Sequence, residues 1–339
     1  MASAKNPPRV VCFGEAMLRL TPPGHERLER TTSLDVTAGG AELNTAVALR
    51  TLGVDAAWVS VLPETSLGRL IARQARASDV DMSGVVWVPE AAGRAGVYFL
   101  EEGVDPRPSA VTYDRADSAM AQVDPAAFDW KALLASAAAL HISGITPAIS
   151  ESCRQATRDA MDAAKRAKVP VAFDLNYRSK LWTEQEARTT FQDLAPRSNI
   201  LFASRNGLRT FFDIEGDREA VLRTARKELG LDAVVMTRKR NRGSRGIRLA
   251  SVALGGEGEI AKSPWREVEI VDRLGGGDAF AAGFLAGYLE DPSDLVRACS
   301  LGTAAAALKH TVPGDFLAAT RAEIEAVLAA DDEGGVLQR

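Results

Sequence analysis

The sequence contains few of the residues that build disulfide frameworks or metal sites. Only three cysteines occur, Cys12, Cys153 and Cys299, and no two of them have the spacing of a zinc or redox motif. The three histidines are equally scattered, so a histidine-based metal site finds no support and we assign no metal ligand. We expect the cysteines to be reduced and buried as small apolar residues, as in a cytoplasmic protein.

The chain also lacks a long apolar run and an excess of positive charge. The most apolar helix that the pattern predicts, residues 279–289, is about half as long as a membrane span. The first nine residues are polar and lack the apolar core of a secretory signal. With 41 basic and 45 acidic residues, the net charge of -4 does not fit a nucleic-acid binder. We therefore expect a cytoplasmic protein that binds neither membranes nor nucleic acids.

Short apolar runs alternate with amphipathic segments along most of the 339 residues. The expected strands are 10–14, 56–62, 138–142, 169–175, 200–203 and 233–237. The expected helices are 41–52, 67–78, 151–168, 183–194, 217–229, 279–289, 293–309 and 318–329, followed by a polar tail at 331–339. Strands that alternate with helices predict an α/β fold, in which a mainly parallel central sheet lies between two helical layers.

Two segments interrupt this alternation. Residues 15–36 and 93–120 contain no convincing helix, and 96–100 and 110–113 resemble exposed strands. Long structureless loops are uncommon in compact domains and often serve as lids. We expect both segments to form a small β-sheet lid over one edge of the main sheet, within a single domain of residues 1–339. Because such a lid leaves unpaired strand edges, we also expect a homo-oligomer that assembles through it.

The strongest local signal is a run of three glycines followed by Asp278 within residues 272–278. Glycines let backbone N–H groups approach a ligand closely, and the helix that follows adds its positive dipole end. Such a site suits a phosphoryl group that gains negative charge, and Asp278 could take the proton of an attacking hydroxyl. The run is equally compatible with a turn in which Asp278 only caps the helix. No Walker-type P-loop is present.

Two further segments allow both a functional and an ordinary interpretation. Gly39 and Gly40 permit a substrate to approach the backbone, and Asn44 offers a donor and an acceptor, but a double glycine before a helix is also a common turn. The basic segment from Arg238 to Arg248 is either a solvated loop or a loop that binds an anion. Neither segment decides the function by itself.

Taken together, the two glycine segments resemble the signatures of the ribokinase-like (PfkB) sugar and nucleoside kinases. The first signature corresponds to residues 39–44, and the second, Asp-Thr-x-Gly-Ala-Gly-Asp in the family, to 272–278. Residues 140–147, 173–182 and 309–316 resemble 2-keto-3-deoxygluconate kinases within that family. The resemblance covers nearly the whole chain. It implies a ribokinase-like fold and transfer of the ATP γ-phosphate, with Mg²⁺, to the 6-hydroxyl of 2-keto-3-deoxygluconate.

The resemblance also implies roles for individual residues. Asp278 would be the general base, and the backbone of Gly275, Gly276 and Gly277 would form the anion hole. The residues implied to bind the sugar are Gly40, Asn44, Tyr98, Tyr113, Arg115, Arg178 and Asp315. The residues implied to bind the nucleotide are Thr237, Arg238, Gly243, Gly246, Gly275 and Gly277.

An acidic sugar needs a cation, and the planar guanidinium group matches both oxygens of a carboxylate. Arg115 and Arg178 are therefore the candidates that would select a sugar acid, although either could be an ordinary surface arginine. Arg178 follows an expected strand, at the edge where open α/β sheets bind ligands. Asp315 could likewise serve only as the cap of the helix that follows it.

The sequence departs from the family pattern in two places that concern ions. The usual Asn-x-x-Glu, which helps to hold magnesium-bound waters, falls near residues 204–207, where neither residue is in register. Arg273 replaces a small residue after Asp272, and its charge opposes a monovalent cation, so activation by such an ion stays open. Two alternatives to the leading hypothesis also stay open: a kinase for fructose, ribose or another keto-deoxy sugar, and a sugar-sensing protein without turnover.

Overall fold

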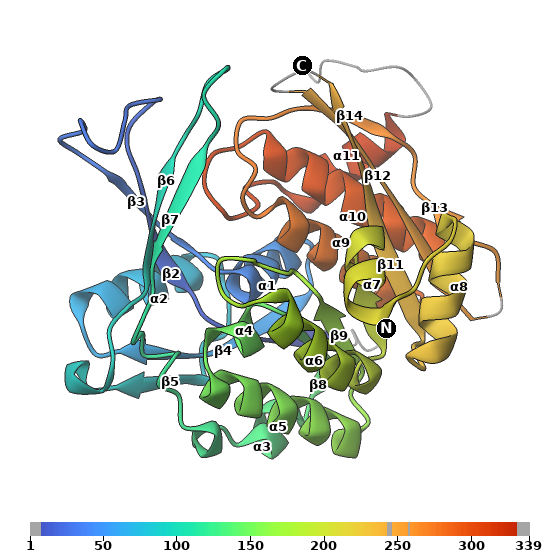
Figure 1. Cartoon of the computed structure of the whole chain (residues 1–339), viewed down its shortest axis with the longest axis horizontal. Helices are drawn as coiled ribbons and strands as arrows, with labels where there is room; N and C mark the ends of the chain where they lie inside the picture. The colour runs from blue at the N-terminus through green and yellow to red at the C-terminus, as the bar shows by residue number, and fades with distance from the viewer. Residues whose placement is uncertain (1–7, 243–245, 257, 331–339) are drawn as a thin grey trace, which may run out of the picture.

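The strands of the protein form two sheets. The computed structural model describes residues 8–242, 246–256 and 258–330. In the larger sheet the strands follow the order β13-β12-β11-β10-β9-β8-β1-β4-β5, and β14 pairs with β12 (Figure 1). The bounds of these strands are β1 Arg9–Phe13, β4 Asp55–Pro63, β5 Val85–Val88, β8 Ala137–Ser143, β9 Val171–Asp174, β10 Ile200–Phe202, β11 Ala233–Arg242, β12 Gly246–Gly255, β13 Ala261–Lys262 and β14 Arg266–Glu269.

Most of the large sheet is parallel. Every neighbouring pair from β5 to β11 runs parallel, whereas β12 pairs antiparallel with β11, β13 and β14. Strand β1 is apolar on both sides, and Val10, Val11 and Cys12 are fully buried. Such strands are typical of a sheet that helices cover on both faces, and their carboxyl ends share one edge of the sheet.

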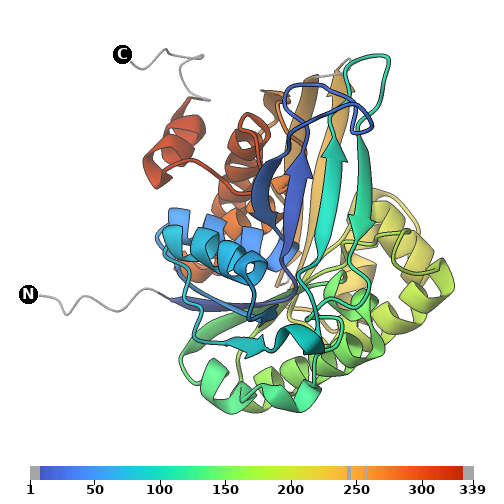
Figure 2. The same ribbon diagram turned by 90° about the vertical axis from the view of Figure 1, so that its left-hand side faces the viewer.

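Helices cover both faces of this sheet (Figures 1 and 2). One face packs against α1 Ala41–Thr51, α2 Ser66–Ala77, α9 Gly276–Glu290, α10 Leu295–His310 and α11 Arg321–Ala329. The other face packs against α3 Trp130–Leu134, α4 Thr146–Ile149, α5 Glu151–Ala167, α6 Glu184–Leu194, α7 Arg205–Phe212 and α8 Arg218–Glu228. Short 3₁₀ helices are η1 Glu90–Ala92, η2 Pro125–Ala127 and η3 Ala195–Arg197.

Helix α9, which carries the glycine run, is fixed by close packing against α10. A methyl group on Gly283 would lie 2.7 Å from the Cα of Gly302, and one on Gly287 would lie 2.7 Å from the Cα of Ala298. Small residues therefore let the two backbones approach each other, which is the reason for the Ala- and Gly-rich composition of both helices. The start of α9 is consequently held by backbone-to-backbone contact.

The small sheet has the strand order β3-β2-β6-β7, with bounds β2 Met17–Thr21, β3 Asp35–Gly39, β6 Val97–Glu101 and β7 Ala110–Asp114. The pairs β2–β3 and β6–β7 are antiparallel, and β2–β6 is parallel. Figure 1 shows this sheet apart from the β11–β12 hairpin, with α9 and α10 between the two. Its strands come from the two predicted lid segments, although β3 continues three residues beyond 36, to Gly39.

The predicted architecture is confirmed: a mainly parallel sheet lies between two helical layers, and a small sheet stands apart from it. All three cysteines are free and buried, as expected. Within the part of the chain that the structure describes, no helix is both long enough and apolar enough to span a membrane. The single-domain organisation stays a prediction, and the predicted tail at 331–339 lies outside the described residues.

One prediction about the basic segment is wrong. The strand expected at 233–237 continues as β11 to Arg242 and pairs residue by residue with β12, so Arg238, Arg240, Arg242 and Arg248 stand on the strands of a hairpin, whereas Arg245 lies outside the described residues. The end of β11 carries charged residues on both of its faces, so no apolar periodicity is left there to indicate a strand. The same reasoning missed β5, β13, β14, α3, α4 and α7, which are short, and also β12, a ten-residue strand that is largely apolar and buried.

Candidate active site

Asp278 stands in the first turn of helix α9, directly behind the glycine run. Gly275 is the N-cap, with a left-handed φ of 77°, and has no side chain, so Asp278 is not the capping residue. The side-chain amide of Asn44, from α1, donates to Asp278 Oδ2 at 2.7 Å. The two glycine-containing segments, separated by 234 residues at this contact, therefore meet at one carboxylate.

The carboxyl groups at this point are unusually basic. Burial raises the pKa of Asp278 to about 6, although the hydrogen bond from Asn44 and the charge of Arg178 act in the opposite direction. Burial, followed by the charge of Asp278, raises the pKa of Asp174 at the end of β9 to about 7. A carboxylate whose pKa lies near 6 is ionised at neutral pH and accepts a proton more readily than an ordinary aspartate.

The three glycines differ in what surrounds them. Gly275 has a positive φ, and a methyl group there would strike the carbonyl oxygen of Asp315. A methyl group on Gly276 would strike the ring of His310. Gly277 has no atom within 4 Å of the position of a side chain, and it lines a pocket. Packing therefore requires the first two glycines, whereas the third leaves space for a ligand.

Gly40 is the N-cap of α1 and lies against the chain that leaves β1. Its N–H donates to Asn44 Oδ1 at 3.2 Å, and a methyl group on Gly40 would lie 2.8 Å from the Cα of Ala16. The amide of Asn44 thus binds the Gly40 backbone with its oxygen and Asp278 with its nitrogen. These two hydrogen bonds fix the amide between the two signatures.

Side chains of the small sheet reach Asp315. Tyr98 of β6 is buried and donates its hydroxyl to Asp315 Oδ2 at 2.7 Å. Tyr113 of β7 lies beside it, with ring centroids 5.9 Å apart, and is 36% exposed. Asp315 does not cap a helix, because α11 begins at Arg321 with Thr320 as its cap. The structure therefore brings these three predicted sugar-binding residues together.

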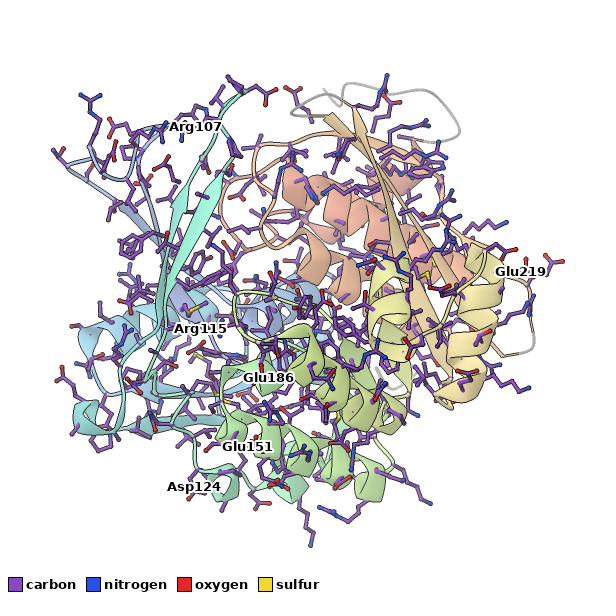
Figure 3. All side chains as sticks on the ribbon, viewed as in Figure 1. Arg107, Arg115, Asp124, Glu151, Glu186 and Glu219 are labelled. Carbon is purple, nitrogen blue, oxygen red and sulfur yellow. The ribbon has the colours of Figure 1, made fainter. Side chains whose placement is uncertain are left out.

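The two predicted sugar-acid arginines have different surroundings. Arg115, at the foot of the small sheet, forms an ion pair with the buried Glu15, which also accepts a hydrogen bond from Ser118 (Figure 3). Arg178 is exposed just beyond β9 and forms no ion pair with any residue that the structure describes. Its charge lowers the pKa of both Asp174 and Asp278, which indicates that it lies near the reacting end of the site.

A pocket of about 320 Å³ follows the carboxyl edge of the large sheet. Phe202 and Phe211 line it with apolar surface, and Thr237 and Gly277 line it from the side of β11 and α9. Its other lining residues, mostly polar, are Asp174, Leu175, Asn176, Tyr177, Glu184, Ala203, Ser204, Asn206, Gly207, Thr210, Val235 and Phe280. The pocket joins the strand ends to the glycine run.

The predicted nucleotide-binding residues lie along β11 and β12. Thr237 faces the pocket, whereas Arg238 faces the other side of the sheet, with its guanidinium 4.6 Å from the centre of the Trp265 ring. Arg240 lies over the same ring at 4.8 Å. Gly246 is the first residue of β12 and pairs with Arg242. Gly243 lies outside the described residues.

The altered segment at 204–207 contributes no acidic side chain to the pocket. The Ser204 hydroxyl accepts a hydrogen bond from the Gly207 N–H at 2.9 Å and caps helix α7. Among the described residues there is no cluster of three or more acidic, histidine or cysteine side chains that could hold a metal ion. Any divalent cation here would therefore need oxygen ligands from a bound substrate.

A second buried carboxylate, Glu42, lies behind the site in the first turn of α1. Its Oε1 accepts hydrogen bonds from the Ser143 N–H at 2.9 Å and from the hydroxyls of Ser143 and Thr146, each at 2.8 Å. The side chain is 1% exposed, and burial raises its pKa to about 7 despite these bonds. Among the residues that the structure describes, no cation forms an ion pair with it.

Comparison with known proteins identifies the family. The model of the pfkB family of carbohydrate kinases matches residues 7–320. The chain belongs to this family. Its ribokinase-like fold and the expected carbohydrate-kinase class are thereby confirmed, because the match spans both signatures and both sheets.

The relatives of this kinase include three proteins that are named for closely related sugar substrates. It is 39% identical to the 2-dehydro-3-deoxygalactonokinase of Haloferax volcanii, over 96% of this chain and 98% of that protein. It is 29% identical to the 2-dehydro-3-deoxygluconokinase of Bacillus subtilis, over 90% of each chain. The crystal structure of the 2-dehydro-3-deoxygluconokinase of Thermotoga maritima superposes with a TM-score of 0.90 at 36% identity, covering 95% of this chain and 98% of that one.

The charged residues at this kinase site that were not foreseen from the sequence include the half-buried Asp174 and the buried Glu15, Glu42 and Arg19. Asp174 could have been found, because it ends an expected strand at the edge where the other site residues gather. Arg19, on β2, binds Asp272 and Asp315 with a side chain that is 3% exposed. No local sequence pattern marks Arg19 or Glu42 as buried, because their partners are distant in the sequence.

Proposed function

We propose that this kinase transfers the γ-phosphoryl group of ATP to the 6-hydroxyl of 2-keto-3-deoxygluconate (2-dehydro-3-deoxy-D-gluconate). One observation carries the proposal: the Asn44 amide of the first signature binds the Asp278 carboxylate of the second at 2.7 Å. An amide beside a half-buried carboxylate with a raised pKa at a helix N-terminus provides a proton acceptor next to an anion site.

In the proposed mechanism Asp278 is the general base. Its pKa of about 6 leaves it ionised at neutral pH, and it takes the proton of the 6-hydroxyl as that oxygen attacks phosphorus. The N–H groups around Gly275, Gly276 and Gly277 stabilise the negative charge of the transferred group, together with the dipole of α9. The open space at Gly277 supports close approach of the phosphoryl group to this backbone.

The sugar would lie between the glycine run and the small sheet. Arg178 is the proposed partner of the sugar carboxylate, since its guanidinium has no ionic partner among the described residues. Arg115 would contribute while bound to Glu15, and Tyr113 would close over the sugar. Tyr98 and Asp315, together with the backbone of Gly40, would bind the sugar hydroxyls. The Asn44 amide would orient both the sugar and Asp278.

The triphosphate of ATP would occupy the pocket between Thr237 and Gly277. On β11, Lys239 lies on the same face of the strand as Thr237, whereas Arg238 lies on the other face and stacks on Trp265. Arg238 and Gly246 would contact the phosphates from the β11–β12 hairpin. Mg²⁺ fits this site as part of Mg-ATP, because it needs only one or two carboxylates beside phosphate oxygens, and Asp174 lines the pocket. The metal would neutralise charge on the phosphates.

A second candidate substrate is 2-keto-3-deoxygalactonate, the epimer at C4. It is favoured by the 39% identity with the 2-dehydro-3-deoxygalactonokinase, which exceeds the identities with the two gluconokinases above. The two acids share the carboxylate, the keto group and the terminal hydroxyl, so the proposed roles of Arg178 and Asp278 are the same for both.

A coupled ADP-release assay tests the proposal with both keto-deoxy acids, fructose and ribose, each with Mg-ATP. We expect the highest kcat/KM with a keto-deoxy acid, and a loss of roughly 100- to 10,000-fold in Asp278→Asn. Preference for a neutral sugar would contradict the substrate proposal. Equal rates in the wild type and Asp278→Asn would indicate a protein that binds sugar without turnover.

We also propose that the chain forms a homo-oligomer through the small sheet. Strand β7 is the edge of that sheet, and most of its residues are exposed. Light scattering at micromolar concentration should give at least a dimer. A monomer would contradict this proposal without affecting the proposed reaction.

A further inference from the structure

Arg19 joins the small sheet to the two loops that build the reacting end of the site. Its Nη1 lies 2.6 Å from Asp272 Oδ2 and 2.9 Å from Asp315 Oδ1, and its Nη2 lies 3.4 Å from Glu102 Oε1. The Nε–H donates to the Thr21 hydroxyl at 2.9 Å. The guanidinium of Arg19, on strand β2 of the small sheet, thus binds Asp272 in one of these loops and Asp315 in the other.

Both aspartates also contact the backbone of the site. Asp272, at the start of the glycine run, accepts hydrogen bonds from the Leu274 N–H at 3.0 Å and the Gly314 N–H at 2.9 Å. Asp315 follows Gly314, and its carbonyl lies where a side chain on Gly275 would be. Asp272 therefore ties the glycine run to the loop that carries Asp315.

The three charged side chains at the centre of this arrangement are almost fully buried. The side chains of Arg19, Asp272 and Asp315 are 3%, 2% and 8% exposed. Lys309 is fully buried beside them and donates to the Val312 carbonyl at 3.2 Å. Its charge, with that of Arg19, balances the two aspartates. Buried charges of this kind are held in one geometry, because each displaced group would lose its partner away from water.

We propose that Arg19 is a positioning residue that fixes the position of the small sheet relative to the glycine run. The sugar-binding Asp315 and the phosphoryl-binding glycines are thereby placed together, since the same nitrogen of Arg19 holds Asp315 and Asp272. The kinetic effects expected from this role rest on the proposed function. Its structural effect can be measured without substrate.

The position requires a planar group with several donors and not a charge alone. A lysine keeps the positive charge, and its ammonium could replace Nη1 at the two aspartates, but it lacks the further donors with which Nε and Nη2 bind Thr21 and Glu102. Arg19→Lys is therefore the informative variant, and Arg19→Met removes the charge as well. Arg107 provides the matched control, because it binds Glu101 and the His25 carbonyl at the far end of the small sheet (Figure 3).

The experiment combines hydrogen exchange of the full-length protein with steady-state kinetics. In Arg19→Lys we expect faster amide exchange in peptides that cover 272–278 and 313–316, and no change there in Arg107→Met. We expect kcat to fall about tenfold and the KM for the sugar to rise about tenfold, with the KM for ATP within about threefold.

The outcomes separate this proposal from simpler roles and from the proposed function. Wild-type exchange and kcat in Arg19→Lys, with losses only in Arg19→Met, would assign Arg19 to charge balance and overturn the proposal. A lower kcat without any change in exchange at the two loops would also overturn it. Absence of turnover of keto-deoxy acids by the wild type would refute the proposed function alone, and the exchange comparison would still decide on Arg19.

Discussion

Replacing Glu42 by glutamine is expected to stabilise the protein, and to do so more strongly at high pH. All three hydrogen bonds to this side chain, from Ser143 and Thr146, end on Oε1. Glutamine retains an oxygen for these donors and removes the negative charge. The wild-type carboxyl group, in contrast, ionises inside the fold as the pH rises through about 7, and no cation of the described residues pairs with it.

The size of the effect follows from the pKa of Glu42, which rises from an ordinary 4.5 to about 7. Because the folded state binds its proton more tightly, the wild type loses stability as pH rises through this window, and the loss is complete above pH 7. At about 1.36 kcal/mol for each pH unit, the loss reaches about 1 kcal/mol at pH 5.5 and about 3 kcal/mol at pH 8. The Glu42→Gln variant lacks this loss, so its advantage should grow by about 2 kcal/mol between the two pH values.

Urea unfolding of both proteins at pH 5.5 and pH 8 measures this difference. The control is Glu151→Gln, which alters an exposed glutamate of α5 (Figure 3) and should change the free energy of unfolding by less than about 0.5 kcal/mol at either pH. A Glu42→Gln variant that is less stable than the wild type at pH 8 would refute the reasoning. It would mean that the ionised carboxylate is favourable where it lies.

Three further predictions concern turnover. Gly277→Ala should retain the wild-type melting temperature, because the space around a methyl group there is open, and its kcat/KM for ATP should fall on the order of 100-fold. Gly276→Ala should instead lower the melting temperature, because the methyl group would strike the ring of His310. The kcat/KM for the sugar should rise with pH through about 6 as Asp278 ionises, and a flat profile from pH 5 to 8 would exclude it as the base. Arg178→Met should raise the KM for sugar acids roughly 10- to 100-fold without affecting a neutral sugar, and equal effects on both would remove its carboxylate role.

Much of this architecture could be predicted because its determinants are local. The buried strands β1 and β9 are continuous apolar runs, and glycines mark the starts of α1 and α9, where backbone approaches require them. The β11–β12 hairpin could not be recognised in the same way. Arg238 and Arg240 interrupt the apolar pattern; they stand on a strand because β11 pairs with β12, and their guanidinium groups lie over the ring of Trp265, which follows later in the chain.

The unforeseen part of the site consists of charged residues with distant partners. Glu42 precedes Leu43 in a helix, where the sequence does not distinguish it from a surface glutamate; its burial involves Ser143 and Thr146, about 100 residues later in the chain, which bind its carboxylate. Arg19 alternates with apolar residues in β2 as a solvent-facing residue would. Its burial depends on Asp272 and Asp315 from the other end of the chain, which no local pattern reveals.

The span between Arg19 and its partners has a consequence for how the protein is made. Asp272 and Asp315 follow Arg19 by 253 and 296 residues. At a synthesis rate of roughly 5 to 20 residues per second, Arg19 waits on the order of tens of seconds for the first of these two aspartates. During that time its strand has no acidic residue from the C-terminal third to dock against, although Thr21 and Glu102 are already present. The growing chain therefore cannot assemble the small sheet against the glycine run until Asp315 has left the ribosome, and the site is completed only after that.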